Sequence, residues 1–197
     1  MAHRGGGEVS STLAPSPATV SESAVLRPLL RRNAAVIQGT FATLWAVRFA
    51  LVTGAWLESA AVALVAVGAS VLAFRDTRGL QARTAFRTAA GRRFLRPVTI
   101  ATVVQILASI LLPMAVGMLG GEGLVMPTVA LTISTFLIWF ARPLALPAVA
   151  WVGGAWTVVA ISLPLGASGA TMVAATCAVA SAALLVSTWC TARAATH

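Results

Sequence analysis

The stretch from Arg75 to Arg96, RDTRGLQARTAFRTAAGRRFLR, decides how this chain is organised. It contains seven of the fourteen basic residues, all of them arginine, because the chain has no lysine. Apolar segments flank it on both sides. A basic loop between two apolar segments stays on the cytoplasmic side of a membrane and fixes the orientation of the segments around it. The stretch therefore predicts a polytopic membrane protein and predicts which way it faces.

The composition supports the same class of protein. Of the 197 residues, 58% are hydrophobic and only 10% are charged, and the mean hydropathy is +0.90. Soluble domains carry about 25% charged residues, whereas a bilayer accommodates apolar residues that come in runs of about 20. The net charge of +9 raises the question of nucleic acid. Because the arginines adjoin apolar runs, we expect the partner to be a bilayer with anionic headgroups and no nucleic acid.

The apolar runs predict an all-α bundle of six membrane-spanning helices with both termini in the cytoplasm, and hence a multi-pass protein of the cell membrane. We expect a disordered cytoplasmic tail over 1–26, rich in Ser, Thr, Gly and Pro, and a transmembrane domain over 27–197. Thirteen of the fourteen arginines then fall on the inside, as the positive-inside rule requires. The predicted spans, with the Arg-rich loop 75–96 after the second, are 34–53, 55–74, 98–119, 124–141, 144–163 and 170–192.

Two finer features are predicted within this frame. Residues 80–94 place Leu80, Phe86 and Phe94 near one face if they are helical, which predicts a short interfacial helix with its arginines at the headgroups. In the fifth span, Ala150 and Gly154 recur at a four-residue spacing, which is typical of a close helix contact.

Ionisable residues inside a membrane are costly, at about 2.5–3.5 kcal/mol for a charge near the middle of a span. Only Arg48 and Glu58 fall within the predicted spans, at similar depth on adjacent antiparallel helices. We expect them to pair. The pair is either a structural clasp or the polar end of a ligand pocket that opens outward. In a simpler alternative, Arg48 snorkels and Glu58 sits in headgroup water.

Neutral polar residues complete the candidate site. Gln105 lies in the third span and Thr135 in the fourth, while Trp45 lies deep in the first with an indole N–H that needs a partner. Each is either an interhelical hydrogen bond or a ligand contact. The candidate ligand-binding residues are therefore Arg48, Glu58, Trp45, Gln105 and Thr135. We expect no cofactor and no metal, because both histidines are near the termini and no HExxH, Walker A or paired-Asp motif occurs.

The segment from Arg93 to Leu163, about a third of the chain, resembles a group of small six-span membrane proteins of actinobacterial type. RRFLRPVTIATVVQ up to Gln105, GLVMPTVAL from Gly123 and FLIWFARPLALP from Phe136 carry the resemblance. It implies the six-span architecture and no particular activity. Members of that group often have a His just before the equivalent of Phe136, where this chain has Thr135, so no histidine role carries over.

Two functions remain open on the sequence. In the first, the protein binds a lipophilic small molecule, helps to export it, or confers immunity to it, which fits spans with so few ionisable groups. In the second, it is an intramembrane enzyme that acts on an apolar substrate, such as an isoprenoid or terpene cyclase. Glu58 would then be the general acid, although the predicted spans offer no second carboxyl group.

Overall fold

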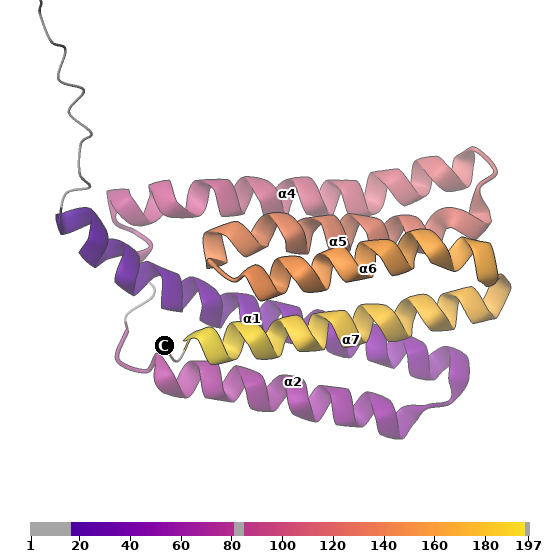
Figure 1. The fold of residues 1–197 in the computed structure, drawn as a ribbon, viewed down its shortest axis with the longest axis horizontal. Coiled ribbons are helices and arrows are strands. Elements are labelled where there is room, and N and C mark those ends of the chain that lie inside the picture. The colour runs from indigo at the N-terminus through magenta and orange to yellow at the C-terminus, as the bar shows by residue number, and fades with distance from the viewer. Residues whose placement is uncertain (1–16, 81–84, 196–197) are drawn as a thin grey trace, which may run out of the picture.

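The computed structural model describes residues 17–80 and 85–195, and in these ranges the fold is all-α, as predicted, with short turns between the helices and no strand (Figure 1). Six helices are long and apolar enough to cross a membrane. A short 3₁₀ turn, η1 (Glu122–Leu124), precedes the fourth of them. The six helices are α1 (Pro17–Thr53), α2 (Trp56–Asp76), α4 (Ala89–Met118), α5 (Val125–Leu144), α6 (Pro147–Gly166) and α7 (Gly169–Ala195).

The helices lie roughly along one axis and alternate in direction, so that their connections gather at the two ends of the bundle (Figure 1). Gly54 joins α1 to α2 and has a φ of 79°, a left-handed conformation that glycine adopts without strain. The chain also turns after α4, close to the predicted end of the third span at 119, whereas α6 continues to Gly166, three residues beyond the predicted end of the fifth span at 163. At the other end, the turn after α5 places Ala145 in the left-handed region, at φ 53°.

Two of the helices begin earlier than the sequence predicts. Helix α1 already runs from Pro17, so residues 17–26, which we placed in the tail, continue the first helix. The rest of the predicted tail, 1–16, lies outside the described residues. Pro28 and Pro97, which precede the predicted spans 34–53 and 98–119, therefore lie inside α1 and α4.

The prediction of a separate interfacial helix over 80–94 is wrong for residues 89–94, which belong to α4. Thr88 is the N-cap of α4, because its extended backbone lets its hydroxyl accept a hydrogen bond from the Gly91 amide at 2.9 Å. Residues 89–94 therefore begin the membrane-spanning helix itself. Residues 81–84, in the first half of the prediction, lie outside the described part of the chain.

The bundle has two halves. Helix α7 packs mainly on α1 and also on α2, while α5 packs on α6 and α4. The α6–α7 contact joins the halves, and α4 touches little besides α5. The α1–α7 seam contains a buried hydrogen bond between Thr191 and the Gln38 side-chain oxygen, at 3.2 Å. The Gln38 amide nitrogen has no partner there.

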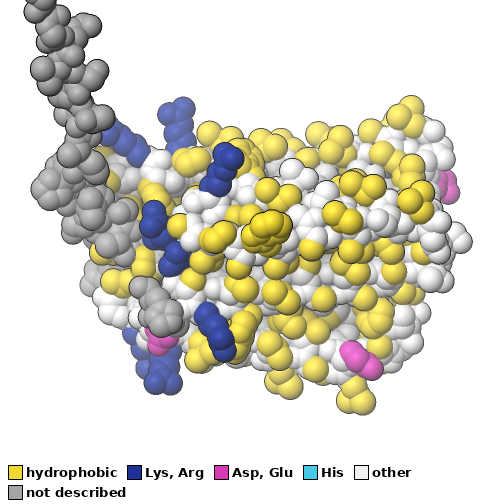
Figure 2. Space-filling view, in the orientation of Figure 1, with side chains coloured by type: hydrophobic (Ala, Val, Ile, Leu, Met, Phe, Trp, Pro, Cys, Tyr) yellow, Lys and Arg dark blue, Asp and Glu magenta, His cyan; other side chains and the backbone are white. Residues whose placement is uncertain are grey.

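Charge divides the molecule by its ends. Arginine side chains gather at the end where α4 begins and α2 and α7 finish, and apolar side chains cover the body between the ends (Figure 2). We call this end the basic end. This segregation is what a bilayer imposes, because arginine is far less costly at the headgroups than in the hydrocarbon.

Arg31 ties the halves together at the basic end. Its guanidinium donates hydrogen bonds to the carbonyl oxygens of Leu144, at 2.9 Å, and Ala194, at 2.6 Å. These carbonyls belong to the last turns of α5 and α7, where helices leave oxygens without intrahelical partners and carry partial negative charge. One α1 side chain therefore caps a helix in each half.

The close approach of α5 and α6 occurs at Gly153, one residue from the predicted Gly154. A Cβ atom at Gly153 would lie 2.9 Å from the Ser134 carbonyl oxygen, whereas one at Gly154 would meet nothing within 4 Å. The four-residue spacing indicated that a contact exists in this helix. It could not select the face, because small residues occur on more than one side of α6.

Candidate functional site

The candidate site is a groove between α4 and α5, at the middle of both helices, with a volume of about 350 Å³. Gln105 and Thr135, two of the predicted ligand-binding residues, both line it. We call it the α4–α5 groove. The other groups that line it are mostly apolar, and they are Ala101, Val104, Ala108, Leu112, Thr128, Leu131, Thr132, Phe136 and Trp139.

A short chain of hydrogen bonds links two residues that line this groove, Gln105 on α4 and Thr132 on α5. The Gln105 amide donates to the Ser109 hydroxyl at 2.9 Å, and Ser109 lies 3.3 Å from the Thr132 hydroxyl. Thr132 also donates to the Val129 carbonyl at 2.8 Å. These bonds join α4 to α5 and hold the Gln105 side chain at the groove.

Gln105 is the polar group best placed to meet a ligand. A side-chain amide has two donors and one acceptor, and Gln105 uses one donor, on Ser109, among the described residues. Thr135 has no hydroxyl proton left for a ligand, because its hydroxyl already donates to the Leu131 carbonyl at 2.8 Å. The groove therefore presents an unused amide carbonyl and N–H in otherwise apolar walls, which suits a neutral molecule with one hydrogen-bonding group.

The other three predicted site residues lie elsewhere. Glu58 is in the first turn of α2 and Arg48 is one to two turns before the end of α1, and both are exposed. Within the described chain no ion pair joins them, so the predicted pair does not form. Arg48 instead interacts with the Cys177 thiol of α7. Trp45 packs against the hydrophobic core.

We predicted that Arg48 and Glu58 pair because they lie at similar depth on adjacent helices. Similar depth does not show which neighbouring helix each side chain faces. Helix α1 contacts both α2 and α7, and Arg48 interacts on the α7 side. The contact of α1 and α2 at this depth is made instead by Ser59, whose buried hydroxyl donates to the Ala46 carbonyl. A helical-wheel comparison of all the spans could have raised this alternative, but it could not have chosen between the two neighbours.

Sequence reasoning missed Ser109, the middle member of the hydrogen-bond chain. The signal was present, because Ser109 follows Gln105 by four residues and so lies on the same helix face. It also missed Gln38, a buried polar residue in the first predicted span. Among the described residues, no three His, Cys, Asp or Glu side chains come together in a way that could hold a metal ion.

No family model, no curated protein and no solved structure matches this chain. The resemblance to small six-span membrane proteins of actinobacterial type therefore stays a prediction.

Proposed function

We propose that this membrane protein binds a lipophilic small molecule taken from the bilayer, and that it does so in order to export the molecule or to protect the cell from it. The α4–α5 groove is the proposed site. Its volume of about 350 Å³ falls in the range of small-molecule sites, about 300–1,000 Å³. The observation that carries the proposal is the partly used amide of Gln105, near the middle of α4 in an apolar wall.

The depth of the groove supports a neutral ligand. The α4–α5 groove contains no ionisable residue in its lining, and a charged ligand at this depth would have no counterion and would lose its hydration. A neutral hydroxyl or carbonyl would exchange a bond to water for a bond to Gln105. We further propose that the basic end faces the cytoplasm, so that the groove opens sideways to lipid between the two headgroup layers.

Photoaffinity labelling tests this proposal. The purified protein in nanodiscs would be irradiated with a diazirine derivative of farnesol, a neutral isoprenoid alcohol, and the labelled peptides mapped by mass spectrometry. We expect labelling on both sides of the groove, within 101–112 and 128–139, and saturation by excess farnesol. Uniform labelling of all lipid-facing helices would contradict a site.

The variant Gln105→Leu should reduce saturable labelling several-fold, because the apolar walls remain while the amide is lost. Thr102→Leu is the matched control, since Thr102 is exposed on the same helix and does not line the groove. Equal labelling of both variants and of the parent protein would remove Gln105 from the site.

The enzymatic alternative has less support. Glu58 is exposed and does not line the α4–α5 groove. A general acid for a cyclisation needs an apolar pocket that holds the substrate against the acid. Product analysis after incubation with geranylgeranyl diphosphate or a neutral polyene would revive the alternative if a cyclised product appeared and Glu58→Gln abolished it.

A further inference from the structure

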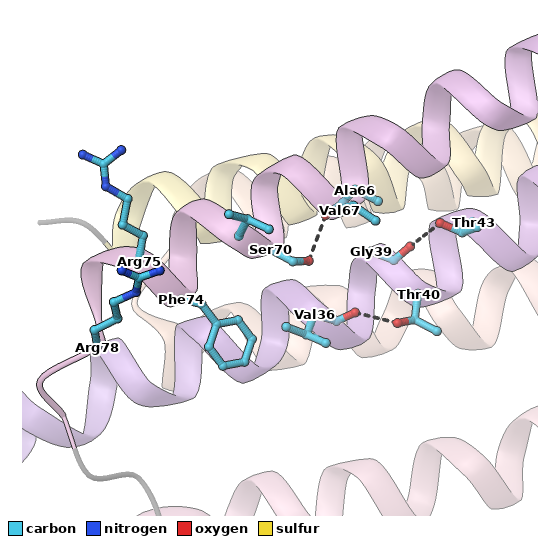
Figure 3. A pocket seen from close by; sticks show the side chains of 11 residues that line it. Val36, Gly39, Thr40, Thr43, Ala66, Val67, Ser70, Phe74, Arg75 and Arg78 are labelled. Atoms are coloured by element: carbon cyan, nitrogen blue, oxygen red, sulfur yellow. Dashed lines mark hydrogen bonds between the residues drawn. The ribbon is translucent and has the colours of Figure 1, made fainter.

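A second groove lies between α1 and α2 and reaches the basic end, and it is a different site from the one proposed above (Figure 3). Its volume is about 510 Å³. Val36 and Gly39 contribute to it from α1, and Val67 and Val71 contribute from α2. We call it the α1–α2 groove. Its length along the helices, from the middle of α1 to the end of α2, suits a long and narrow ligand.

The walls of this groove are apolar in practice, although three hydroxyl groups line it. Thr40, Thr43 and Ser70 each donate to the carbonyl oxygen four residues earlier in their own helix, at 2.9, 3.0 and 2.8 Å (Figure 3). A hydroxyl that is satisfied in this way has no proton left for a ligand. The groove therefore suits a hydrocarbon chain.

The floor of the groove is closed. A Cβ atom at Gly39 would lie 3.3 Å from the Ala66 Cβ, so the two helices are in van der Waals contact behind the groove. The absence of a side chain at Gly39 allows this approach. A chain in the groove would contact both helices along its length.

Two arginines stand at the basic end of the groove. Arg75 and Arg78 are three residues apart and both line it (Figure 3). Both are exposed, and neither makes a hydrogen bond or an ion pair with any residue in the described ranges. The intervening Asp76 pairs with neither of them there. The two guanidinium groups thus bring ten N–H donors to the mouth of an apolar groove, and no described residue accepts from them.

Arg32 completes this end from α1. Its guanidinium stacks on the Phe74 ring, 4.8 Å from the centroid, and lies 3.5 Å from the Thr77 hydroxyl. Phe74 itself lines the groove. The cation–π contact fixes the ring between the apolar part of the groove and the arginines. The polar and apolar parts therefore meet at a defined depth.

We propose that the α1–α2 groove binds a lipid with a phosphate monoester headgroup, with one acyl chain along the groove and the phosphate between Arg75 and Arg78. A phosphate monoester carries about −1.5 to −2 charges at pH 7, which matches two guanidinium groups that have no ion pair with any described residue. Guanidinium also binds phosphate oxygens in pairs. A phosphodiester headgroup carries a single negative charge and fewer free oxygens, so it fits this pair of cations less well.

Native mass spectrometry of the full chain, released from detergent micelles, tests the proposal. Dioleoyl phosphatidic acid and dioleoyl phosphatidylglycerol have the same chains and differ in the headgroup. We expect one tightly bound phosphatidic acid and several-fold weaker binding of phosphatidylglycerol. The double variant Arg75→Gln/Arg78→Gln should weaken phosphatidic acid binding by about five-fold for each arginine, the equivalent of about 1 kcal/mol per residue.

The matched control for the headgroup is Arg93→Gln/Arg96→Gln. These two arginines are exposed, are also three residues apart, lie at the basic end on α4, and line neither groove. The control should leave the affinity unchanged. If both double variants lost phosphatidic acid affinity equally, binding would reflect only a general attraction to a basic surface. Equal affinity for phosphatidic acid and phosphatidylglycerol would contradict a preference for a phosphate monoester.

The matched pair for the chain is Thr40→Trp and Thr102→Trp. Both threonines are exposed and both donate to the carbonyl four residues earlier, but only Thr40 lines the α1–α2 groove. Thr40→Trp should fill the groove and weaken phosphatidic acid binding several-fold, while Thr102→Trp should not. Unchanged binding in Thr40→Trp would overturn the placement of the chain. Thermal unfolding of each variant identifies any loss that comes from misfolding.

Discussion

The α1–α2 groove and the α4–α5 groove are both apolar slots between neighbouring antiparallel helices, and they differ in the kind and depth of their polar groups. The α1–α2 groove has cations at one end, and its hydroxyls are bonded to their own helices. The α4–α5 groove has no charge and keeps a partly used amide in the middle of α4.

The difference follows from what each depth of a bilayer tolerates. A guanidinium group at the headgroups keeps its hydration and meets anionic lipid, whereas a neutral amide is the most polar group that the hydrocarbon accepts at modest cost. Each groove therefore has the polarity that its depth allows, and this polarity is the basis of the ligand class that we propose for it. Variants at both grooves and at the helix contacts around them can show whether membrane depth or local packing determines which polar groups are tolerated.

A charge in the middle of the α4–α5 groove should have the largest effect. Gln105→Asp should destabilise the protein in a bilayer by about 2.5–3.5 kcal/mol, because the short carboxylate cannot reach the headgroups. Thr99→Asp, on the same helix about 9 Å nearer the basic end, should be much milder. Thermal unfolding in nanodiscs measures both. Equal losses would show that the depth of the site does not set its polarity.

Arg31 contrasts with Arg75 and Arg78 at the same end of the bundle, because its donors are used within the protein. Arg31→Gln should destabilise the protein by about 2 kcal/mol, since it removes charge-assisted hydrogen bonds to two helix ends. Phosphatidic acid binding should be unaffected. Arg27→Gln, one turn earlier and exposed, should leave the unfolding midpoint in detergent unchanged. An Arg31 variant as stable as the parent would show that the halves do not depend on this tie.

Gly153 supports the α4–α5 groove from behind, because it sets how closely α6 approaches α5. Gly153→Ala should cost about 1.5 kcal/mol, as the new methyl group would overlap the Ser134 carbonyl. Gly154→Ala should be neutral or stabilising by up to about 1 kcal/mol through helix propensity. Unfolding midpoints of the two variants in detergent are the comparison. The reverse order would restore the contact that the sequence predicts at Gly154.

Single interhelical hydrogen bonds should matter least, and equally in the two halves. Ser59 donates to the Ala46 carbonyl between α2 and α1, and Thr157 donates to the Ser134 hydroxyl between α6 and α5, at 2.9 Å. Ser59→Ala and Thr157→Val should each cost about 0.6 kcal/mol, the average for such bonds in a membrane protein. A loss above about 1.5 kcal/mol at either position would show that its half depends on that bond rather than on packing.

The sequence predicted which polar residues lie within the apolar helices, but it did not predict which of them come together. Gln105 and Thr135 could be selected because a polar residue in an apolar run is conspicuous, and they do line one groove. Arg48 and Glu58 were equally conspicuous, but their predicted pairing depended on which neighbour α1 turns toward Arg48. Arg75 and Arg78 of the α1–α2 groove were interpreted only as part of the basic loop 75–96. Their place at the end of a groove depends on how α1 packs against α2, which the sequence does not show.

The sequence by itself determined that this chain has six apolar helices and where they turn, because hydrophobic runs of span length and the turn residues between them are local properties. It also determined the separation of basic from apolar residues. The tertiary structure alone decided which helices are neighbours, that Gly153 rather than Gly154 makes the close contact, and that Arg31 caps two helices distant in sequence. Within lipid every helix has an apolar surface on all sides. The periodicity that would identify the buried face of a soluble helix is therefore weak, and only the packing of small residues and polar groups selects the partners.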